Sequence, residues 1–283
     1  MKAFRRSCFI VVIFLSPAIL SCRKDPSLYR VKNLSGNKVN VFGHGGMGMM
    51  HRYPMNSSAS LEECVSAGAD GVEMDVRMSA DDELFLFHDA SLEAASGCNG
   101  SVEQTPGQSL SLCSYKGPGS HRLEKLRDFL VQHVSGDLLF ALDCKMPDVF
   151  LTNGRMELFA DSLGSLVGRL GLAARVKVES QYPWFLRLVK ERSPGSETYL
   201  YCDDFQVALD VSATQPLDGI TIDREKITPS QVYESQNAGL KVTLFNTRTE
   251  AQNLRALLMN PDNIQTDRVK HLVEVYVKRR ELN

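Results

Sequence analysis

Short apolar segments rich in β-branched residues alternate with amphipathic segments along most of this 283-residue chain. Extended segments are expected at 39–42, from 71 onward, and at 137–145, 176–179, 198–201, 219–222, 241–245 and 263–266. Helical segments are expected at 61–67, 123–134, 157–170, 184–190, 229–238 and 251–259. Strands that alternate with helices predict a parallel sheet covered by helices. About eight such units fit a closed (β/α)₈ barrel, the TIM barrel, better than an open doubly wound sheet.

Polar side chains stand at or near the C-terminal ends of these predicted strands. They are His44, Glu73, Asp75, His88, Asp143, Lys145, Glu179 and Asn246. The carboxyl ends of the strands in a (β/α)₈ barrel meet at one face, and barrel enzymes build their active sites there. We therefore expect an active site at this face.

The segment GADGVEMDVRMSADDELFLFHD, residues 68–89, carries the densest cluster of such groups. Glu73 and Asp75 are two residues apart, so an extended strand points both carboxylates to the same side. Paired carboxylates suit a hard divalent cation such as Ca²⁺ or Mg²⁺. His88, delivered by the next strand, adds a group that transfers protons near neutral pH. The alternative is a solvent-facing strand end with ordinary surface acids.

Composition excludes several other classes of protein. The chain is 43% hydrophobic with a formal net charge of −2, which is typical of a globular protein and gives no electrostatic footprint for nucleic acid. No G-x-x-x-x-G-K turn follows an early strand, which argues against a P-loop nucleotide-binding fold. The sequence does not indicate an oligomeric state.

The N-terminus has the composition of a secretory signal. Basic residues precede the apolar run 8–15, and Ile19-Leu20-Ser21-Cys22 follows. This ending resembles a bacterial lipobox, so Cys22 is expected to carry lipid, with simple secretion or a transmembrane anchor as alternatives. We expect a signal peptide over 1–22, a polar tether over 23–38 and one barrel domain over 39–283. The expected location is the cell envelope, lipid-anchored to a membrane, in the periplasm or at the outer-membrane surface.

Export to an oxidising compartment changes how the cysteines are interpreted. Removing Cys8 with the signal and assigning Cys22 to lipid leaves an odd number of thiols. Cys98 and Cys113 flank a loop rich in Gly, Ser and Pro within the excursion 91–119, and they are the best candidates for a disulfide. No C-x-x-C or Cys/His cluster suggests zinc.

In order along residues 39–269, these motifs resemble the glycerophosphodiester phosphodiesterase family. The opening strand ends at His44, where the family has its first catalytic histidine. GADGVEMDV resembles the family's metal-binding segment, with the ligands falling on Glu73 and Asp75. The motif FHD resembles the segment of the second catalytic histidine, here His88.

The resemblance continues into the later strands. LDCK lies where the family has Glu-x-Lys, so Asp143 would be the third metal ligand and Lys145 would face phosphate. LFNTRT and NIQTDR resemble the last two barrel strands, and Asn246 in the first of them is a candidate to bind substrate. The resemblance implies hydrolysis of small glycerophosphodiesters to glycerol 3-phosphate and an alcohol, by two-histidine acid/base catalysis with one cation, Ca²⁺ or Mg²⁺.

Three departures from the family pattern concern substrate preference and metal affinity. The first histidine is followed by Gly45 where the family has a phosphate-contacting arginine. The loop Pro-Glu-Asn-Thr reads Pro54-Met55-Asn56-Ser57 here, and the third metal ligand is shortened to Asp143. Arg52 is a candidate to replace the missing guanidinium, and the alternative is a solvent-facing side chain.

Two other functions remain open at this point. A related phospholipase would act on a lipid headgroup, and the apolar loop at residues 47–50 would favour it. A catalytically weak barrel would instead bind phosphodiester or polyol ligands in the envelope, and the three departures motivate that alternative.

Overall fold

The computed structural model describes residues 38–152 and 154–277. The predicted signal peptide, the lipidation site Cys22 and all of the predicted tether except Lys38 lie outside these residues. No helix within the described ranges is long and apolar enough to cross a membrane.

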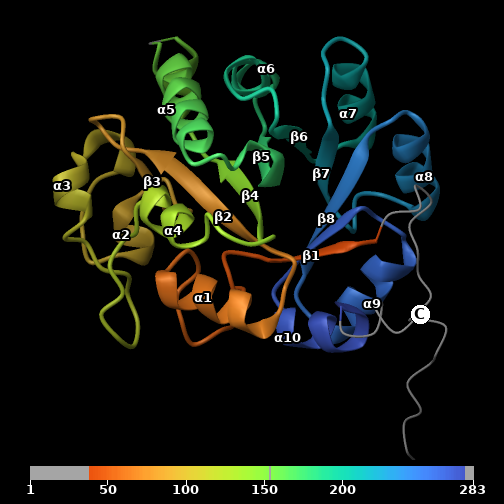
Figure 1. The fold of residues 1–283 in the computed structure, drawn as a ribbon, viewed down its shortest axis with the longest axis horizontal. Helices are drawn as coiled ribbons and strands as arrows, with labels where there is room; N and C mark the ends of the chain where they lie inside the picture. The colour runs from red at the N-terminus through yellow and green to blue at the C-terminus, as the bar shows by residue number, and fades with distance from the viewer. Residues whose placement is uncertain (1–37, 153, 278–283) are drawn as a thin grey trace, which may run out of the picture.

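Eight parallel strands in the described part of the chain close into a barrel, which confirms the predicted TIM fold (Figure 1). They follow the order β1-β9-β8-β7-β6-β5-β4-β2, and pairing of β1 with β2 closes the ring. The strands are β1 (Asn40–Gly43), β2 (Gly71–Met78), β4 (Leu139–Cys144), β5 (Val176–Ser180), β6 (Glu197–Cys202), β7 (Gly219–Asp223), β8 (Lys241–Thr247) and β9 (Asn263–Thr266).

Helices surround the strands and fill the connections between them (Figure 1). They are α1 (Ser58–Ala67), α4 (Leu126–Gln132), α5 (Arg155–Arg169), α6 (Pro183–Arg192), α7 (Phe205–Ser212), α8 (Pro229–Asn237), α9 (Glu250–Leu258) and α10 (Val269–Leu272), with short 3₁₀ turns η3 (Asp148–Leu151) and η4 (Ala173–Arg175) and a final π-helical turn η5 (Val273–Val277). Helix α7 was not predicted. It is only eight residues long and buries little, and its start is fixed by Asp204, which accepts hydrogen bonds from the backbone of Gln206 and Val207.

The two sides of the barrel strands bury different kinds of side chain. Val72, Met74 and Val76 of β2 point outward and are fully buried in the apolar layer between strands and helices. The inside is partly polar, where Lys177 Nζ lies 2.8 Å from Glu179 Oε1. Gln265 donates to both oxygens of Glu179 at 2.9 Å. Glu179 is therefore bound inside the barrel, beneath the face where the sequence predicted a site.

A compact insertion follows β2 and lies outside the barrel (Figure 1). It contains strand β3 (Leu84–Leu86), which pairs antiparallel with β2, and three short helices, α2 (Leu92–Ala95), η2 (Val102–Gln104) and α3 (Gly107–Leu110). Its own apolar cluster includes Phe85, Phe87 and Tyr115. The segment predicted as a loop excursion is thus a small folded unit.

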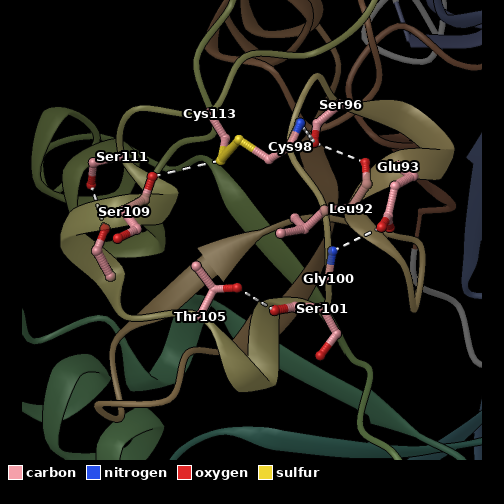
Figure 2. Close-up of a disulfide and its surroundings, with 11 residues drawn as sticks. Leu92, Glu93, Ser96, Cys98, Gly100, Ser101, Thr105, Ser109, Ser111 and Cys113 are labelled. Atoms are coloured by element: carbon pink, nitrogen blue, oxygen red, sulfur yellow. Dashed lines mark hydrogen bonds between the residues drawn. A yellow bond between two sulfur atoms is a disulfide. The ribbon is translucent and has the colours of Figure 1, made fainter.

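The predicted disulfide joins Cys98 to Cys113 in this insertion (Figure 2). The same loop is held by a hydrogen bond from Gly100 N to Glu93 Oε1, at 2.9 Å. The disulfide encloses η2 and α3, so it ties the segment after α2 to the segment after α3.

Replacing both Cys98 and Cys113 by serine is expected to lower the free energy of unfolding by about 3 kcal/mol, because the bond closes a loop with a sequence separation of 15 residues. Urea unfolding with and without a reducing agent measures this difference. Reduction should reproduce the loss in the native chain and change nothing in the double variant. Equal stability of the two oxidised proteins would contradict the expectation.

Candidate active site

Three carboxylates meet at the C-terminal ends of β2 and β4. Glu73 and Asp75 project inward from β2, and the strand register places Asp143 of β4 directly beside Asp75. Oxygen atoms of the three groups all lie within 4.8 Å of one another, and all three side chains are buried. The structure therefore brings together the three residues that the sequence proposed as metal ligands.

Burial and neighbouring negative charge raise the pKa of two of these carboxylates, Glu73 and Asp143. Burial and the neighbouring charge of Asp75 raise the pKa of Glu73 well above its usual value. Burial also raises the pKa of Asp143 to about 6, against the opposing effect of Lys145. A cluster of buried oxygen ligands that repel one another fits a hard divalent cation, which would neutralise them.

Lys145 lies against this cluster. Its Nζ is 2.6 Å from Asp143 Oδ2 and 3.4 Å from Asp75 Oδ1. Burial lowers the pKa of this ammonium group, but the charges of Asp143 and Asp75 outweigh burial and raise the pKa above its usual value. Lys145 therefore stays cationic beside the carboxylates, where it can also face an anionic ligand.

His44 follows β1 and pairs with an acid from the far end of the chain. Its Nδ1 lies 2.7 Å from Oδ1 of Asp267, the residue after β9. Burial lowers the pKa of His44, but the hydrogen bond to Asp267 and the charges of Glu73, Asp267 and Asp75 raise it from 6.5 to about 9. Sequence reasoning missed Asp267, although the rule that found the other strand-end groups applies to it.

His88 reaches the same site by a different route from His44. Strand β3 runs antiparallel to β2, so the chain returns toward the carboxylates, and Phe87 N donates to Asp75 O at 3.0 Å. The imidazole is 57% exposed, and its Nδ1 lies 3.0 Å from Asp89 Oδ1. Burial raises the pKa of Asp75, but the charges of Lys145, His88 and His44 and a hydrogen bond from Asn56 outweigh burial and lower this pKa. His44 follows β1, which pairs with β2, and the residue before His88 is hydrogen-bonded to Asp75, so both histidines lie at the end of the barrel that carries the carboxylates.

Asn56 is a second residue that sequence reasoning did not assign to the site. Its Nδ2 donates to Asp75 Oδ2 at 2.8 Å, and its Oδ1 accepts from Asp75 N at 2.9 Å. The residue is buried in a left-handed conformation with φ of 64°, which asparagine tolerates better than most side chains. Asn56 thus fixes the orientation of the Asp75 carboxylate.

Two of the three departures from the family pattern are in contact with each other. Gly45 has φ of +52°, and its N–H donates to Glu73 Oε2 at 2.7 Å. A Cβ at Gly45 would lie 2.6 Å from Cε and 2.7 Å from Cβ of Met55. The side chain of Met55 fills the space that a side chain at residue 45 would need, so the two departures form one local change.

Gly45→Arg is expected to lower the free energy of unfolding strongly. The double variant Gly45→Arg, Met55→Ala should lose less of this free energy than the sum of the losses in the two single variants. The left-handed backbone costs roughly 1–2 kcal/mol in either case, but the overlap with Met55 is removed only in the double variant. Urea unfolding of both single variants and the double variant gives the coupling free energy, expected at about 1 kcal/mol or more. Strictly additive changes would contradict the contact.

The remaining predicted residues are placed differently. Arg52 is 69% exposed and pairs with Glu63 of α1 at 3.2 Å, so its guanidinium is not brought to the carboxylates. Asn246 lies near the C-terminal end of β8, and its Nδ2 donates to Asp223 Oδ2 of β7 at 2.8 Å. Asn246 is therefore at the predicted face.

A pocket of about 220 Å³ opens beside the carboxylate cluster. Its lining includes Asp143 and Lys145 together with Arg77, Cys144, Met146, Gln181, Tyr182 and Tyr201. A pocket of about 390 Å³ lies at the opposite ends of the strands, away from the two histidines. A ligand in the smaller pocket would lie in contact with Asp143 and Lys145.

The fold and site together define a (β/α)₈-barrel enzyme with its charged groups at the C-terminal face. A model of the glycerophosphoryl diester phosphodiesterase family matches residues 47–271, and the chain belongs to this family of phosphoric diester hydrolases.

Individual relatives are distant in sequence. The uncharacterized protein YqiK of Bacillus subtilis is 22% identical over 235 residues, which cover 80% of this chain and 94% of that protein. A phosphodiesterase of Oleispira antarctica, solved in complex with the product sn-glycerol-3-phosphate, superposes with a TM-score of 0.71 at 20% identity, covering 83% of this chain and 96% of that one. A glycerophosphodiester phosphodiesterase of Parabacteroides distasonis gives 0.72 at 19% identity, covering 86% and 97%.

Proposed function

We propose that this chain hydrolyses glycerophosphodiesters to glycerol 3-phosphate and an alcohol, using one divalent cation, Ca²⁺ or Mg²⁺. The observation that carries the proposal is the buried cluster of Glu73, Asp75 and Asp143, flanked by His44 and His88. Membership of the phosphodiesterase family supports the reaction, and the product bound to the Oleispira enzyme supports the glycerol 3-phosphate part of the substrate.

The three carboxylates would hold the cation, which supplies positive charge for the phosphate oxygens. His44 accepts the proton of the attacking oxygen, and His88 donates a proton to the leaving alcohol. The charges of Glu73 and Asp75 contribute to the raised pKa of His44. A cation held by these carboxylates would offset their charge. The pKa of His44 is then expected to fall, so that the neutral imidazole can accept a proton.

Lys145 offsets the negative charge that grows on the phosphoryl group, because its ammonium group lies at the carboxylate cluster and in the lining of the adjacent pocket. Asn246 contributes an amide to substrate at the same face. Arg52 has no role in this proposal, because its guanidinium is bound to Glu63 at the surface.

A lipid substrate is the second candidate function, and one observation favours it. Met49 and Met50, in the loop after β1, are 54% and 78% exposed. The loop is at the same end of the barrel as His44, so its apolar side chains can meet a lipid surface near the site.

Initial rates on glycerophosphocholine and glycerophosphoethanolamine, compared with phosphatidylcholine and phosphatidylinositol in vesicles, test the two candidates. The proposal expects release of glycerol 3-phosphate from the water-soluble diesters and little hydrolysis of vesicles. Faster hydrolysis of vesicles, reduced when Met49 and Met50 are both replaced by serine, would favour the phospholipase. Binding of the soluble diesters without turnover would identify a binding protein instead.

The cellular location is also a proposal. We infer that Cys22 is lipidated and that the chain is anchored in the cell envelope, and the disulfide between Cys98 and Cys113 supports an oxidising compartment. Mass spectrometry of the mature N-terminus tests this inference: diacylglycerol on Cys22 is expected, and an unprocessed N-terminus would contradict it.

A further inference from the structure

Arg77 is the inward-facing residue of β2 two positions after Asp75, at the C-terminal end of the strand. Its guanidinium instead holds the backbone of His88. Nε and Nη2 donate to the carbonyl oxygen of His88 at 3.1 and 2.9 Å. Two hydrogen bonds from one planar, charged group converge on this oxygen and hold the carbonyl of His88 in place.

The third nitrogen of the same guanidinium binds the insertion. Arg77 Nη1 lies 2.5 Å from Glu103 Oε1, and each of these two side chains is only 8% exposed. Glu103 is in η2, inside the loop that the disulfide closes. A buried ion pair gives little net stability because desolvation offsets the attraction, so its effect here is mainly to fix geometry.

The residues just before His88 are also held by the insertion. Tyr115 donates its hydroxyl to Leu86 O at 2.7 Å, and its ring stacks on Phe87 with centroids 5.7 Å apart. The imidazole of His88, by contrast, is mostly exposed and pairs with the side chain of the adjacent residue, Asp89. The placement of the imidazole therefore depends on how firmly its backbone is held.

We propose that Arg77 and Glu103 are positioning residues for His88, through which the insertion sets the direction of the imidazole toward the leaving oxygen. This inference rests on the proposed function, in which His88 protonates the leaving alcohol. Arg77 links the barrel to the insertion, because β2 carries the guanidinium and the insertion supplies the Glu103 carboxylate that orients it.

The test compares two leaving groups on the full chain. The alkoxide of choline is strongly basic and needs a proton as it leaves, whereas p-nitrophenolate does not. His88→Ala should therefore lower kcat on glycerophosphocholine by roughly 10²- to 10⁴-fold and change turnover of the p-nitrophenyl ester of glycerol phosphate far less. Glu103→Gln and Arg77→Lys should show the same selectivity, with a loss of roughly tenfold on the choline ester and under twofold on the nitrophenyl ester.

Glu83→Gln is the matched control. It makes the same chemical change in an ion pair beside β3, with Lys125 at 2.7 Å, that does not involve His88. The ratio of the two rates should stay at its native value in this variant. Thermal unfolding tests whether each variant is folded. If Glu103→Gln does not fold, Arg77→Lys provides the same test.

A spectroscopic arm separates this inference from the proposed function. In histidine-labelled protein, the ring signal of His88 is assigned by its absence in His88→Ala. Glu103→Gln should shift or broaden this signal and leave that of His44 in place. An unchanged His88 signal, or equal losses on both esters in Glu103→Gln, would overturn the positioning role. Absence of leaving-group selectivity in His88→Ala itself would contradict the proposed function, and the spectrum would still decide the role of Arg77 and Glu103.

Discussion

Glu73→Gln is expected to reduce turnover of glycerophosphocholine by about 10³-fold or more and to weaken cation binding. Glutamine has nearly the same size, but it lacks the charge that a divalent ion needs among its ligands. A bound cation contributes several kcal/mol of charge stabilisation in the transition state, and each 1.4 kcal/mol is about tenfold in rate. Steady-state kinetics and calorimetric titration with Ca²⁺ and Mg²⁺ measure the two losses.

The same variant should be more stable than the native chain when both are free of metal. The pKa of Glu73 is raised in the folded chain by burial and by Asp75, so the native protein loses stability as pH rises above the usual value of 4.5 for this carboxyl. Glutamine removes this cost at neutral pH. Thermal unfolding in EDTA tests the sign, with the surface change Glu191→Gln as a control. If Glu73→Gln is both less active and less stable than the native chain, general damage to the fold rather than loss of a metal ligand is indicated.

Asp267→Asn is expected to lower kcat by roughly 10²- to 10⁴-fold, because the amide no longer fixes the orientation and protonation of the His44 ring. It should also lower the pKa of His44, since the hydrogen bond to Asp267 is the largest effect that raises it. The pH dependence of kcat/KM and the titration of the His44 ring by NMR measure the two changes.

The effect of Asp267→Asn on stability has a defined pH window in metal-free protein. A raised pKa means that the folded chain favours protonated His44, so this contribution is fully present below pH 6.5 and is lost as pH rises through about 9. The difference in stability between native and variant chains should therefore shrink across that range. Asp70→Asn, at the other end of the barrel, is the control. A difference independent of pH, with an unchanged His44 titration, would contradict the pairing.

The sequence predicts the barrel and its charged face because both follow from local patterns. Alternating apolar segments indicate strands and helices, and a spacing of two residues places Glu73 and Asp75 on one side of a strand. Helix α7 is not predicted from such patterns, because it begins at the N-cap residue Asp204 and few of its residues are buried. The structure of the insertion is not predicted either, because its short helices pack around a small apolar cluster of their own and have no periodic apolar face.

The partners of the site residues are harder to predict, because folding joins positions that are far apart in the chain. His44 and Asp267 are separated by 223 residues, and Asn56 and Asp75 by 19. Nor does a sequence show that Arg52 turns toward Glu63 at the surface. Such pairings depend on which loops meet above the barrel, and no local periodicity encodes that.

Turnover of glycerophosphocholine by the EDTA-treated chain, measured as Ca²⁺ or Mg²⁺ is added back, tests the proposed function most directly. Release of glycerol 3-phosphate is expected to be absent without metal and to saturate at the cation concentration where calorimetry shows one ion bound per chain. Glu73→Gln should show neither binding nor turnover over the same range. Full turnover in EDTA, or saturated cation binding with no product, would contradict metal-dependent hydrolysis at this cluster.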